Sequence, residues 1–450
     1  MKRKAAISFG TIITLLFLSL VSTVCNRNET NPFPTPADGC TYFTMDYELP
    51  QTQSAEQLAQ YLASEHLEYD LDGWFFFGSL VDSTTPDDLG IFFIAVQRIE
   101  EEVDGFRIPT VPAIVGFNSK SRGNYLFRGA MSIDIDPLVS VSSDPWSVNL
   151  TSPLQEGPLI TMSLISGTMG QVDATYNLTA NIPDIDGTPL EAEVQIRDRF
   201  GAINEGDGTA SFFAQFLTDS QRDQIMNSKD RKVSTYLEET GDPMSCQGSY
   251  YYSLPLLDVE NFSIKLNDTV ISNGNDGLLW MDYVVQSYDE KALEAIQDVS
   301  WQFFAIQLPE INTALMVIEI TTKTGTLPIA KLFDLESEKT LNFASKAKQS
   351  WAINEINIEP VSGSKWVSPK SGKEYNTQHR IQLMSNDYPA DFVVSMITDD
   401  QEIYIEFPDG NGGVKKMIKY EGMATVEGTI AGSQISGQAF VELQPVGGRK

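Results

Sequence analysis

Hydrophobic runs after residue 66 are short, rich in β-branched and aromatic side chains, and separated by Pro, Gly, Asp and Asn. This pattern is typical of β-strands joined by turns. The candidate strands lie at residues 74–77, 91–96, 159–164, 250–256, 278–285, 301–307, 314–321, 350–358, 380–384, 392–397, 402–406, 422–430 and 436–443. Strand–helix–strand alternation is absent, so the pattern predicts a mostly β protein of antiparallel barrels or sandwiches and argues against Rossmann and TIM architectures.

Two segments have helical spacing of their apolar residues instead, at 53–66 and 211–227. The fold is therefore expected to include a few short helices. A turn signal at residues 241–243 divides the chain into two halves of about 200 residues each, a size that suits one domain per half. We expect an N-terminal domain at 40–243 and a C-terminal domain at 244–450.

The N-terminus has the pattern of an export signal over residues 1–24, with three basic residues followed by an uncharged apolar run. A run of this length also suffices to span a bilayer as an uncleaved anchor. Cys25 follows the run directly, as the acceptor cysteine of a bacterial lipoprotein does. The protein is therefore expected to be exported, and either lipid-anchored through Cys25 or released as a secreted or periplasmic protein. Residues 25–39 are polar and proline-rich, which predicts an extended tether.

The two cysteines beyond Cys25 are Cys40 and Cys246. An exported protein meets an oxidising environment, in which two such thiols can pair. We therefore predict a disulfide that ties the start of the folded region to its middle.

Charge and composition exclude several classes of function. The chain has 450 residues and a formal net charge of −30 at pH 7, so it repels nucleic acids. It has 2 histidines, far apart in the sequence, and 3 cysteines, none at C-x₂-C spacing. These counts argue against a His-rich metal site, a zinc ribbon or a Ser-His-Asp triad. Gly-rich phosphate loops are absent as well, and we predict no metal and no cofactor.

Several short motifs occur in an order that resembles the AttH-like and carotenoid-hydratase (hydroxyneurosporene synthase) family. They are DGWFFFGSL at 72–80, SYYYS at 249–253, GLLWMDY at 277–283, VSWQFFAIQL at 299–308, WVSPKSGKEY at 366–375, YEG at 420–422 and GQAFVEL at 437–443. The resemblance is most specific in the second half of the chain. It departs from the family pattern at Tyr283, where the family has histidine after W-M-D, and at Phe75, where the family has a second tryptophan.

The resemblance implies two lipocalin-like domains and an apolar small-molecule ligand. The hydratase members resemble acid catalysts that protonate an isolated alkene, with carboxyl and aromatic groups lining the pocket. Burial in an apolar pocket raises the pKa of a carboxyl group, which can then donate a proton near neutral pH. Aromatic faces can stabilise the resulting cation until water attacks it.

Asp282 is the first candidate for the proton donor, and Tyr283 beside it is the second catalytic candidate. Strand alternation puts Trp280 and Asp282 on one face. The alternatives are that Asp282 is a buried structural aspartate that accepts hydrogen bonds from loop backbone, or an exposed residue. The candidate ligand-binding residues are the aromatic and acidic side chains of the matching motifs: Trp74, Tyr252, Trp280, Trp301, Phe303, Trp366, Tyr375 and Glu442.

Some of these side chains have a structural interpretation too. The segment with Trp366 and Tyr375 is expected to form a turn that packs an aromatic lid, and Glu442 either lines the pocket, faces solvent or accepts hydrogen bonds at a barrel rim. His379 is expected to be exposed beside Arg380. The sequence thus predicts an exported protein that binds an apolar, isoprenoid- or lipid-like ligand, with or without acid–base hydratase, isomerase or cyclase activity. The alternatives are a non-catalytic lipid carrier and a structural cell-surface β-protein.

Overall fold

The structure of the chain is a computed structural model, and it describes residues 59, 62–64, 71–103, 106–123, 125–134, 138–153, 155–184, 187–204, 249–286, 300–322, 325–334, 347–351, 353–408 and 414–444. The predicted export signal, tether and second helix, and Cys25, Cys40 and Cys246, lie outside these residues. Helical structure within them is limited to Ala59, Leu62 and Ala63 of the first predicted helix and to two 3₁₀ turns, η2 (Pro309–Ile311) and η3 (Ile353–Glu355). None of the described helical segments has the length and apolar character needed to cross a membrane.

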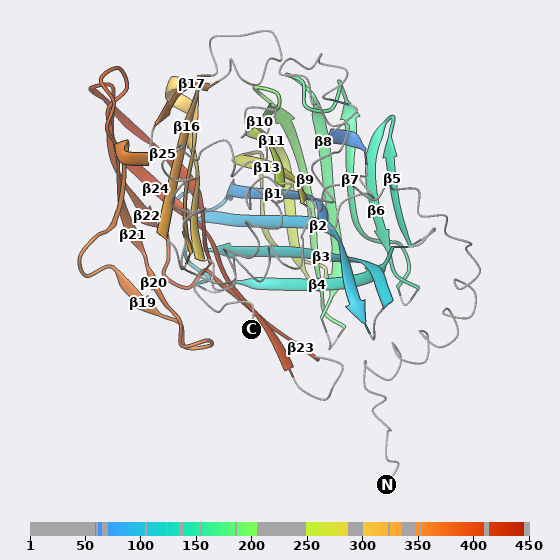
Figure 1. The fold of residues 1–450 in the computed structure, drawn as a ribbon. Helices are drawn as coiled ribbons and strands as arrows, with labels where there is room; N and C mark the ends of the chain where they lie inside the picture. Colours follow the sequence, from blue (N-terminus) through green and yellow to red (C-terminus); the bar gives the residue numbers. More distant parts are fainter. Residues whose placement is uncertain are drawn as a thin grey trace, which may run out of the picture.

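The first sheet has 13 antiparallel strands in the order β4-β3-β2-β1-β13-β11-β9-β8-β7-β6-β5, with β10 and β12 paired to β11. Their bounds are β1 (Leu71–Val81), β2 (Leu89–Val103), β3 (Phe106–Ser119), β4 (Leu126–Ile133), β5 (Val139–Ser143), β6 (Trp146–Thr151), β7 (Pro158–Ser166), β8 (Thr175–Pro183), β9 (Pro189–Asp198), β10 (Ile203–Asn204), β11 (Ser249–Leu266), β12 (Thr269–Gly274) and β13 (Asp276–Gln286). The sheet curls so that β3 and β4 cross over and contact β8 (Figure 1).

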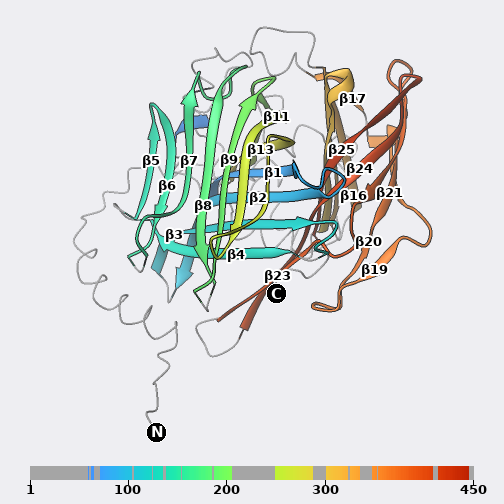
Figure 2. The same cartoon turned by 180° about the vertical axis from the view of Figure 1, so that it is seen from behind.

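The second sheet has 10 antiparallel strands in the order β17-β16-β15-β14-β25-β24-β22-β21-β18, with β23 paired to β24. Their bounds are β14 (Ser300–Leu308), β15 (Thr313–Thr322), β16 (Gly325–Asp334), β17 (Ala347–Trp351), β18 (Ile356–Pro360), β21 (Gln378–Leu383), β22 (Ala390–Met396), β23 (Glu402–Pro408), β24 (Val414–Ile430) and β25 (Ser433–Gln444). Contacts between β16 and β18 bring the two ends of this sheet together, and a hairpin of β19 (Lys365–Val367) and β20 (Glu374–Asn376) lies beside it (Figure 2).

The predicted mostly β fold is confirmed, with two nearly closed antiparallel sheets. The division between them differs from the predicted boundary after residue 243. β11 and β13 pair with β9 and β1 in the centre of the first sheet, so this sheet extends to residue 286. The turn residues at 241–243 are a local signal, whereas strand pairing joins segments that are distant in the sequence. The predicted strand at 350–358 is also interrupted, by η3.

Each sheet encloses its own apolar core because alternate side chains of every strand point inward. Trp146, Tyr176 and Phe76 are fully buried inside the first sheet. Phe304 and Tyr420 are fully buried inside the second sheet. One face of each strand therefore lines the interior of its own sheet.

A third core joins the two sheets, and it consists of side chains that point outward from both. Phe77 and Phe93 of the first sheet pack on Phe440 of the second, with ring centroids 3.9 and 6.3 Å apart. Strands β1, β2, β10, β11 and β13 supply one wall of this core, and β14, β15, β16, β24 and β25 supply the other. Apart from the two-residue β10, these strands are therefore apolar on both faces, unlike strands of a barrel that faces water.

Gly78 marks a place where the first sheet requires glycine. Its φ of +154° lies in a region that side chains rarely adopt, and a Cβ there would lie 2.2 Å from the carbonyl oxygen of Leu278. This close approach lets β1 and β13 remain paired beside the core between the sheets.

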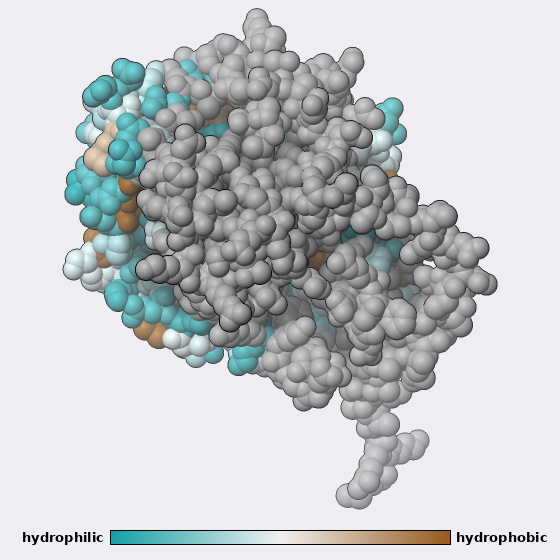
Figure 3. Space-filling model, viewed as in Figure 1, coloured by the Kyte–Doolittle hydropathy of each residue, from teal (hydrophilic) through white to brown (hydrophobic). Residues whose placement is uncertain are grey.

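The described surface at the left of Figure 3 is mostly hydrophilic and carries isolated hydrophobic side chains. Among all described residues, the large apolar side chains that are exposed are Met131, Ile165, Val172, Val270, Ile311, Val367 and Met384. Three of them lie in strands of the first sheet, and the other four lie in loops, in η2 or in the β19–β20 hairpin. Single exposed apolar residues are common on soluble surfaces.

Candidate functional site

The first half of the candidate site is built on β13 and β11, at the face of the first sheet that is turned to the second. Trp280 and Asp282 share this face because they are two positions apart along the strand. Ser253 of β11 is the register partner of Asp282, and Tyr251 lies on the same face. Phe75 of β1 is the register partner on the other side. Asp282 is thus surrounded by side chains from three strands.

The carboxyl group of Asp282 is buried, with 3% of the residue exposed. Its Oδ1 accepts hydrogen bonds from Ser253 Oγ at 2.7 Å and Trp280 Nε1 at 2.5 Å, and its Oδ2 accepts one from the Tyr251 hydroxyl. Burial raises the pKa of Asp282 from 3.8 to about 7, although the three donors lower it, and the charge of Glu442 adds to the increase. A carboxyl group with this pKa can donate or accept a proton at neutral pH.

The second half of the site comes from β14 and β25. Trp301 Nε1 donates a hydrogen bond to Glu442 Oε1 at 2.6 Å, and Phe303 is the register partner of Glu442. The ring of Phe303 meets the ring of Tyr251 edge-on, with centroids 6.2 Å apart. This aromatic contact joins the two halves. Trp301 and Tyr251 are only partly buried, so the acidic end of the core reaches the molecular surface.

A cation lies between two acidic side chains of the second sheet. Lys419 Nζ is 2.9 Å from Glu442 Oε1 and also contacts Glu421 Oε1. Burial lowers the pKa of Lys419, but Glu421 and Glu442 raise it by more, so that the ammonium form is retained. Burial raises the pKa of Glu421, against the opposing effect of Lys419. The site therefore combines three carboxyl groups with one ammonium group.

With increasing distance from the acidic groups, the core between the sheets contains first aromatic side chains and then the side-chain amides of two glutamines. The Phe77–Phe440 pair lies at the level of Trp280, one pleat from the acidic layer. Further along, Gln438 Nε2 donates to the carbonyl oxygen of Leu278 at 3.1 Å, and Gln307 Nε2 donates to that of Leu279 at 2.9 Å. These amide contacts pin the two sheets together, so the relative position of the acidic groups is fixed.

The structure brings together five of the predicted site residues: Asp282, Trp280, Trp301, Phe303 and Glu442. It places three others on the opposite face, inside the first sheet. Tyr283 stacks on Trp74 with centroids 5.2 Å apart, and Tyr252 lies 6.4 Å from Tyr283. Because neighbours in a strand point to opposite faces, Tyr283 cannot share the surroundings of Asp282. The two catalytic candidates thus lie on opposite faces of β13, and the position that departs from the family histidine lies outside the acidic cluster of Asp282, Glu421 and Glu442.

Trp366 and Tyr375 also lie apart from Asp282. They stack on each other at 5.9 Å, and Tyr375 lies 5.0 Å from Tyr420 in the core of the second sheet. Tyr375 donates a hydrogen bond of 2.9 Å to the buried Glu402. Ser368 donates to the same carboxylate at 2.5 Å. These contacts hold the β19–β20 hairpin against the sheet and support the structural interpretation of this motif.

His379 was expected to be exposed, and this prediction is wrong. The residue is 1% exposed, inside the second sheet, with its ring 5.3 Å from that of Phe304. Burial lowers the pKa of His379 to about 4, so the imidazole is neutral at pH 7. The adjacent Arg380 points to the outside and binds Asp391. Strand alternation places these neighbours on opposite faces.

Five side chains of the site were not selected from the sequence: Tyr251, Ser253, Phe75, Lys419 and Glu421. The first three could have been found, because they lie on strands whose facing is set by alternation. Lys419 and Glu421 offered no such signal. They reach the site only through the pairing of β24 with β25.

The hydrogen bond from Tyr251 to Asp282 stabilises the carboxylate form. We expect the Tyr251→Phe variant to raise the pKa of Asp282 further above 7, by roughly one unit, since a hydrogen bond to a charged group contributes about 1.5–3 kcal/mol. The titration can be followed by ¹³C NMR of labelled aspartate carboxyl groups. Tyr252→Phe is the matched control, because its ring points into the first sheet, and an equal shift in that variant would contradict the assignment.

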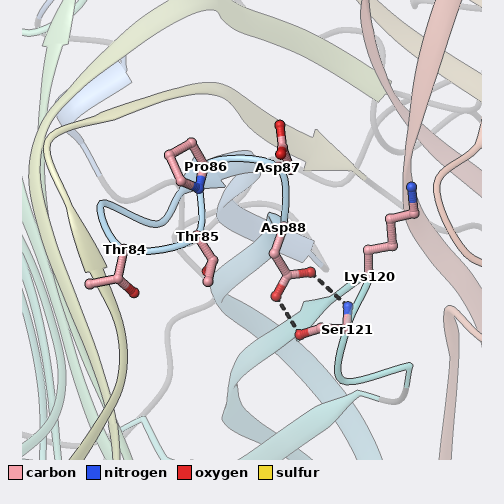
Figure 4. A pocket seen from close by; sticks show the side chains of 7 residues that line it. All are labelled: Thr84, Thr85, Pro86, Asp87, Asp88, Lys120 and Ser121. Carbon is pink, nitrogen blue, oxygen red and sulfur yellow. Dashed lines mark hydrogen bonds between the residues drawn. The ribbon is translucent and has the colours of Figure 1, made fainter.

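Two other features of the described residues carry less chemistry. A shallow depression of about 510 Å³ is lined by Thr84, Thr85, Pro86, Asp87, Asp88, Lys120 and Ser121 (Figure 4). Asp88 accepts a 2.6 Å hydrogen bond from the backbone N–H of Ser121 and a second bond from its hydroxyl, so its carboxylate is already engaged. Within the part of the chain that the structure describes, no group of three His, Cys, Asp or Glu side chains could hold a metal ion.

Fold and site together define a class of protein: two facing antiparallel β-sheets with a buried, acidic and aromatic site in the core between them. The family model described as AttH-like matches residues 234–446 of the chain. The resemblance predicted from the motifs is thereby confirmed over this region, which supplies every residue of the acidic cluster.

Two crystal structures share the fold over most of their length. One is a protein assigned as AttH from Nitrosomonas europaea, with a TM-score of 0.58, 17% identity, and coverage of 86% of this chain and 95% of that chain. The other is kievitone hydratase from Nectria haematococca, with a TM-score of 0.51, 13% identity, and coverage of 88% and 95%. No curated protein sequence matches the chain.

Proposed function

We propose that the protein is an exported, cofactor-free acid catalyst that adds a proton to a carbon–carbon double bond of an apolar, isoprenoid-like ligand bound between the two sheets. The observation that carries this proposal is the surroundings of Asp282. A buried carboxyl group with a pKa of about 7 is hydrogen-bonded to Trp280 and Tyr251, and the ring of Tyr251 contacts Phe303. Strongly shifted carboxyl pKa values of this kind cluster at functional sites.

The geometry supports a defined role for each group. Asp282 in its protonated form donates its proton to the double bond, and the aromatic faces of Trp301 and Phe303 stabilise the cation that forms. The Tyr251, Ser253 and Trp280 donors then stabilise the carboxylate that is left. Addition of water to the cation gives hydration, and loss of a neighbouring proton gives isomerisation. Kievitone hydratase is a hydratase by name, and it has the same fold.

The charge of the site narrows the substrate class. Two glutamates share Lys419, and Asp282 adds a third acidic group. A carboxylate or phosphate on the substrate would be repelled there, whereas a neutral alkene that becomes cationic would be stabilised. We therefore expect neutral isoprenoid alcohols to be better substrates than fatty acids or prenyl diphosphates.

The test is incubation of the full chain with geraniol, farnesol and oleic acid in D₂O, followed by mass spectrometry of the recovered compounds. Hydration adds one D₂O, and isomerisation adds one deuterium at carbon. We expect at least one of the neutral alcohols to be labelled, and oleic acid to remain unlabelled. Recovery of all three compounds unchanged, with native mass spectrometry showing them bound, would favour the lipid-carrier alternative. An absence of binding would contradict an apolar site between the sheets.

A further inference from the structure

The pairing of β24 with β25 places two glutamates directly opposite each other. Glu421 and Glu442 are register partners, and both point into the core between the sheets. Like charges at directly opposed positions of a sheet are destabilising. Glu421 is 1% exposed, so its charge is also largely removed from water. Two opposed glutamates can both stay charged in these surroundings only if a nearby positive group offsets their repulsion.

Lys419 supplies this positive group. It lies two residues before Glu421 on the same face of β24, and its ammonium group contacts one oxygen of each glutamate. Glu442 Oε1 therefore has two positive or polar donors, Lys419 Nζ at 2.9 Å and Trp301 Nε1 at 2.6 Å. An adjacent cation favours the charged form of a carboxyl group. The three donors that the structure shows at Asp282 are all neutral.

Glu442 and Asp282 therefore differ in the groups that contact their carboxyl oxygens. Glu442 faces an ammonium group, whereas Asp282 faces two aromatic donors and a hydroxyl group. The two are near enough for the charge of Glu442 to act on Asp282. Pairs of carboxyl groups with unequal surroundings commonly divide into an acid and a base.

We propose that Lys419 is a positioning residue that holds the carboxylate of Glu442 as the proton acceptor of the reaction in which Asp282 is the proton donor. This inference rests on the proposed function and assigns its second proton transfer. Lys419 itself does not exchange a proton with the substrate.

The transfer balances without any further reactant besides water. The O–H bond of Asp282 breaks as a C–H bond forms, which leaves a carbocation and the Asp282 carboxylate. The oxygen of water forms a bond to the cationic carbon, and its surplus proton passes to Glu442. Glu442 then releases this proton and Asp282 regains one through solvent, so the net change is addition of one water to the alkene. In an isomerisation, Glu442 accepts the proton from the neighbouring carbon instead.

The experiment uses the labelling assay on whichever neutral alcohol the wild-type chain converts. Lys419→Met is expected to lower kcat by about 10²-fold with KM changed less than about 3-fold, since the lysine acts on the base and not on substrate binding. Lys419→Arg keeps the charge and should return kcat to within about 10-fold of wild type. Lys416→Met is the matched control, because Lys416 is an exposed lysine on the same strand, with its Nζ 5.5 Å from the ring of Tyr404.

A double-mutant cycle shows whether the lysine acts through the glutamate. Glu442→Gln should lower kcat as much as Lys419→Met does, and the double variant should be no slower than Glu442→Gln alone. If Lys419→Met does not fold, Lys419→Met combined with Glu421→Gln removes the cation together with one of the two carboxylates. Wild-type rates in the lysine variants, or additive losses in the cycle, would overturn the inference. A wild-type chain that converts none of the alcohols contradicts the proposed function instead.

Discussion

Replacing Asp282 with asparagine is expected to lower the rate of deuterium incorporation by about 10³-fold at pH 7, because an amide has no acidic proton to donate and a general acid typically contributes 10²–10⁴-fold. The wild-type rate should itself fall about tenfold for each pH unit above 7, since only the protonated form of Asp282 is active and burial raises its pKa to about 7. Rates measured from pH 5 to 9 with a fixed alcohol test both statements.

Asp276→Asn is the matched control for this prediction. Asp276 is exposed at the start of the same strand, where it accepts a hydrogen bond from the backbone N–H of Gly277. Its replacement should leave the rate and its pH dependence unchanged. If Asp282→Asn keeps the wild-type rate, Asp282 is the structural aspartate of the alternative interpretation, and the proton comes from another group.

The Asp282→Asn variant should be more stable than wild type near neutral pH. The pKa of Asp282 is higher in the folded state than its ordinary value of 3.8, so the unfolded chain releases this proton first and stability is lost as the pH rises toward 7. The full difference corresponds to at most about 4 kcal/mol. Chemical denaturation at pH 4 and pH 8 measures it. A gain in stability with a loss of rate would show that the variant is folded and that the group serves function.

Replacing His379 with leucine changes the free energy of unfolding, and we expect this change to be about 3 kcal/mol more stabilising at pH 4.5 than at pH 7.5. Burial lowers the pKa of His379 from 6.5 to about 4 in the folded state. Between these values the unfolded chain binds a proton that the folded chain does not, so wild-type stability falls as the pH drops through this range. Leucine has no such proton, and it suits the apolar surroundings of Phe304.

The prediction concerns the difference between variant and wild type, because Asp282 changes the stability in the opposite direction over the same pH range. Urea unfolding at pH 4.5 and pH 7.5 gives this difference directly. The sequence has 2 histidines, so ¹H NMR of the imidazole protons can also show whether one of them titrates near pH 4. An equal effect of His379→Leu at both pH values would mean that the imidazole is protonated inside the second sheet or is open to water.

The fold class could be predicted because each strand carries its own evidence. Leu278 to Val285 is a short, mostly apolar run that directly follows Asn, Asp and Gly, and the structure has β13 (Asp276–Gln286) there. Strands that combine apolar and charged residues were harder to delimit. β24 begins at Val414, well before the predicted start at residue 422, because its first part pairs with the edge strand β23. This part contains several lysines, so its sequence does not have the apolar pattern of a strand. Pairing supplies the stabilisation that the local sequence does not show.

The site was predictable on one side only. Alternation alone places Trp280 and Asp282 on one face and Tyr283 on the other. The sequence was therefore sufficient to show that Tyr283 does not share the site of Asp282. The facing of β24 toward Asp282 depends instead on the packing of two sheets whose strands are more than 100 residues apart in the chain. Lys419 therefore remained unnoticed, because a single lysine in a strand gives no indication of what it opposes.

The strand order of the first sheet has a consequence for synthesis on the ribosome. β9 pairs with β11 and β1 pairs with β13, so these two central edges of the sheet stay open until residues 266 and 286, respectively, have left the exit tunnel. A nascent chain of 243 residues would leave one edge of β1 and one edge of β9 unpaired. β1 is largely apolar, and open strand edges are templates for aggregation. The region matched by the AttH-like family, residues 234–446, is thus not an independent unit of folding. Its first strands complete a sheet that the preceding part of the chain has begun.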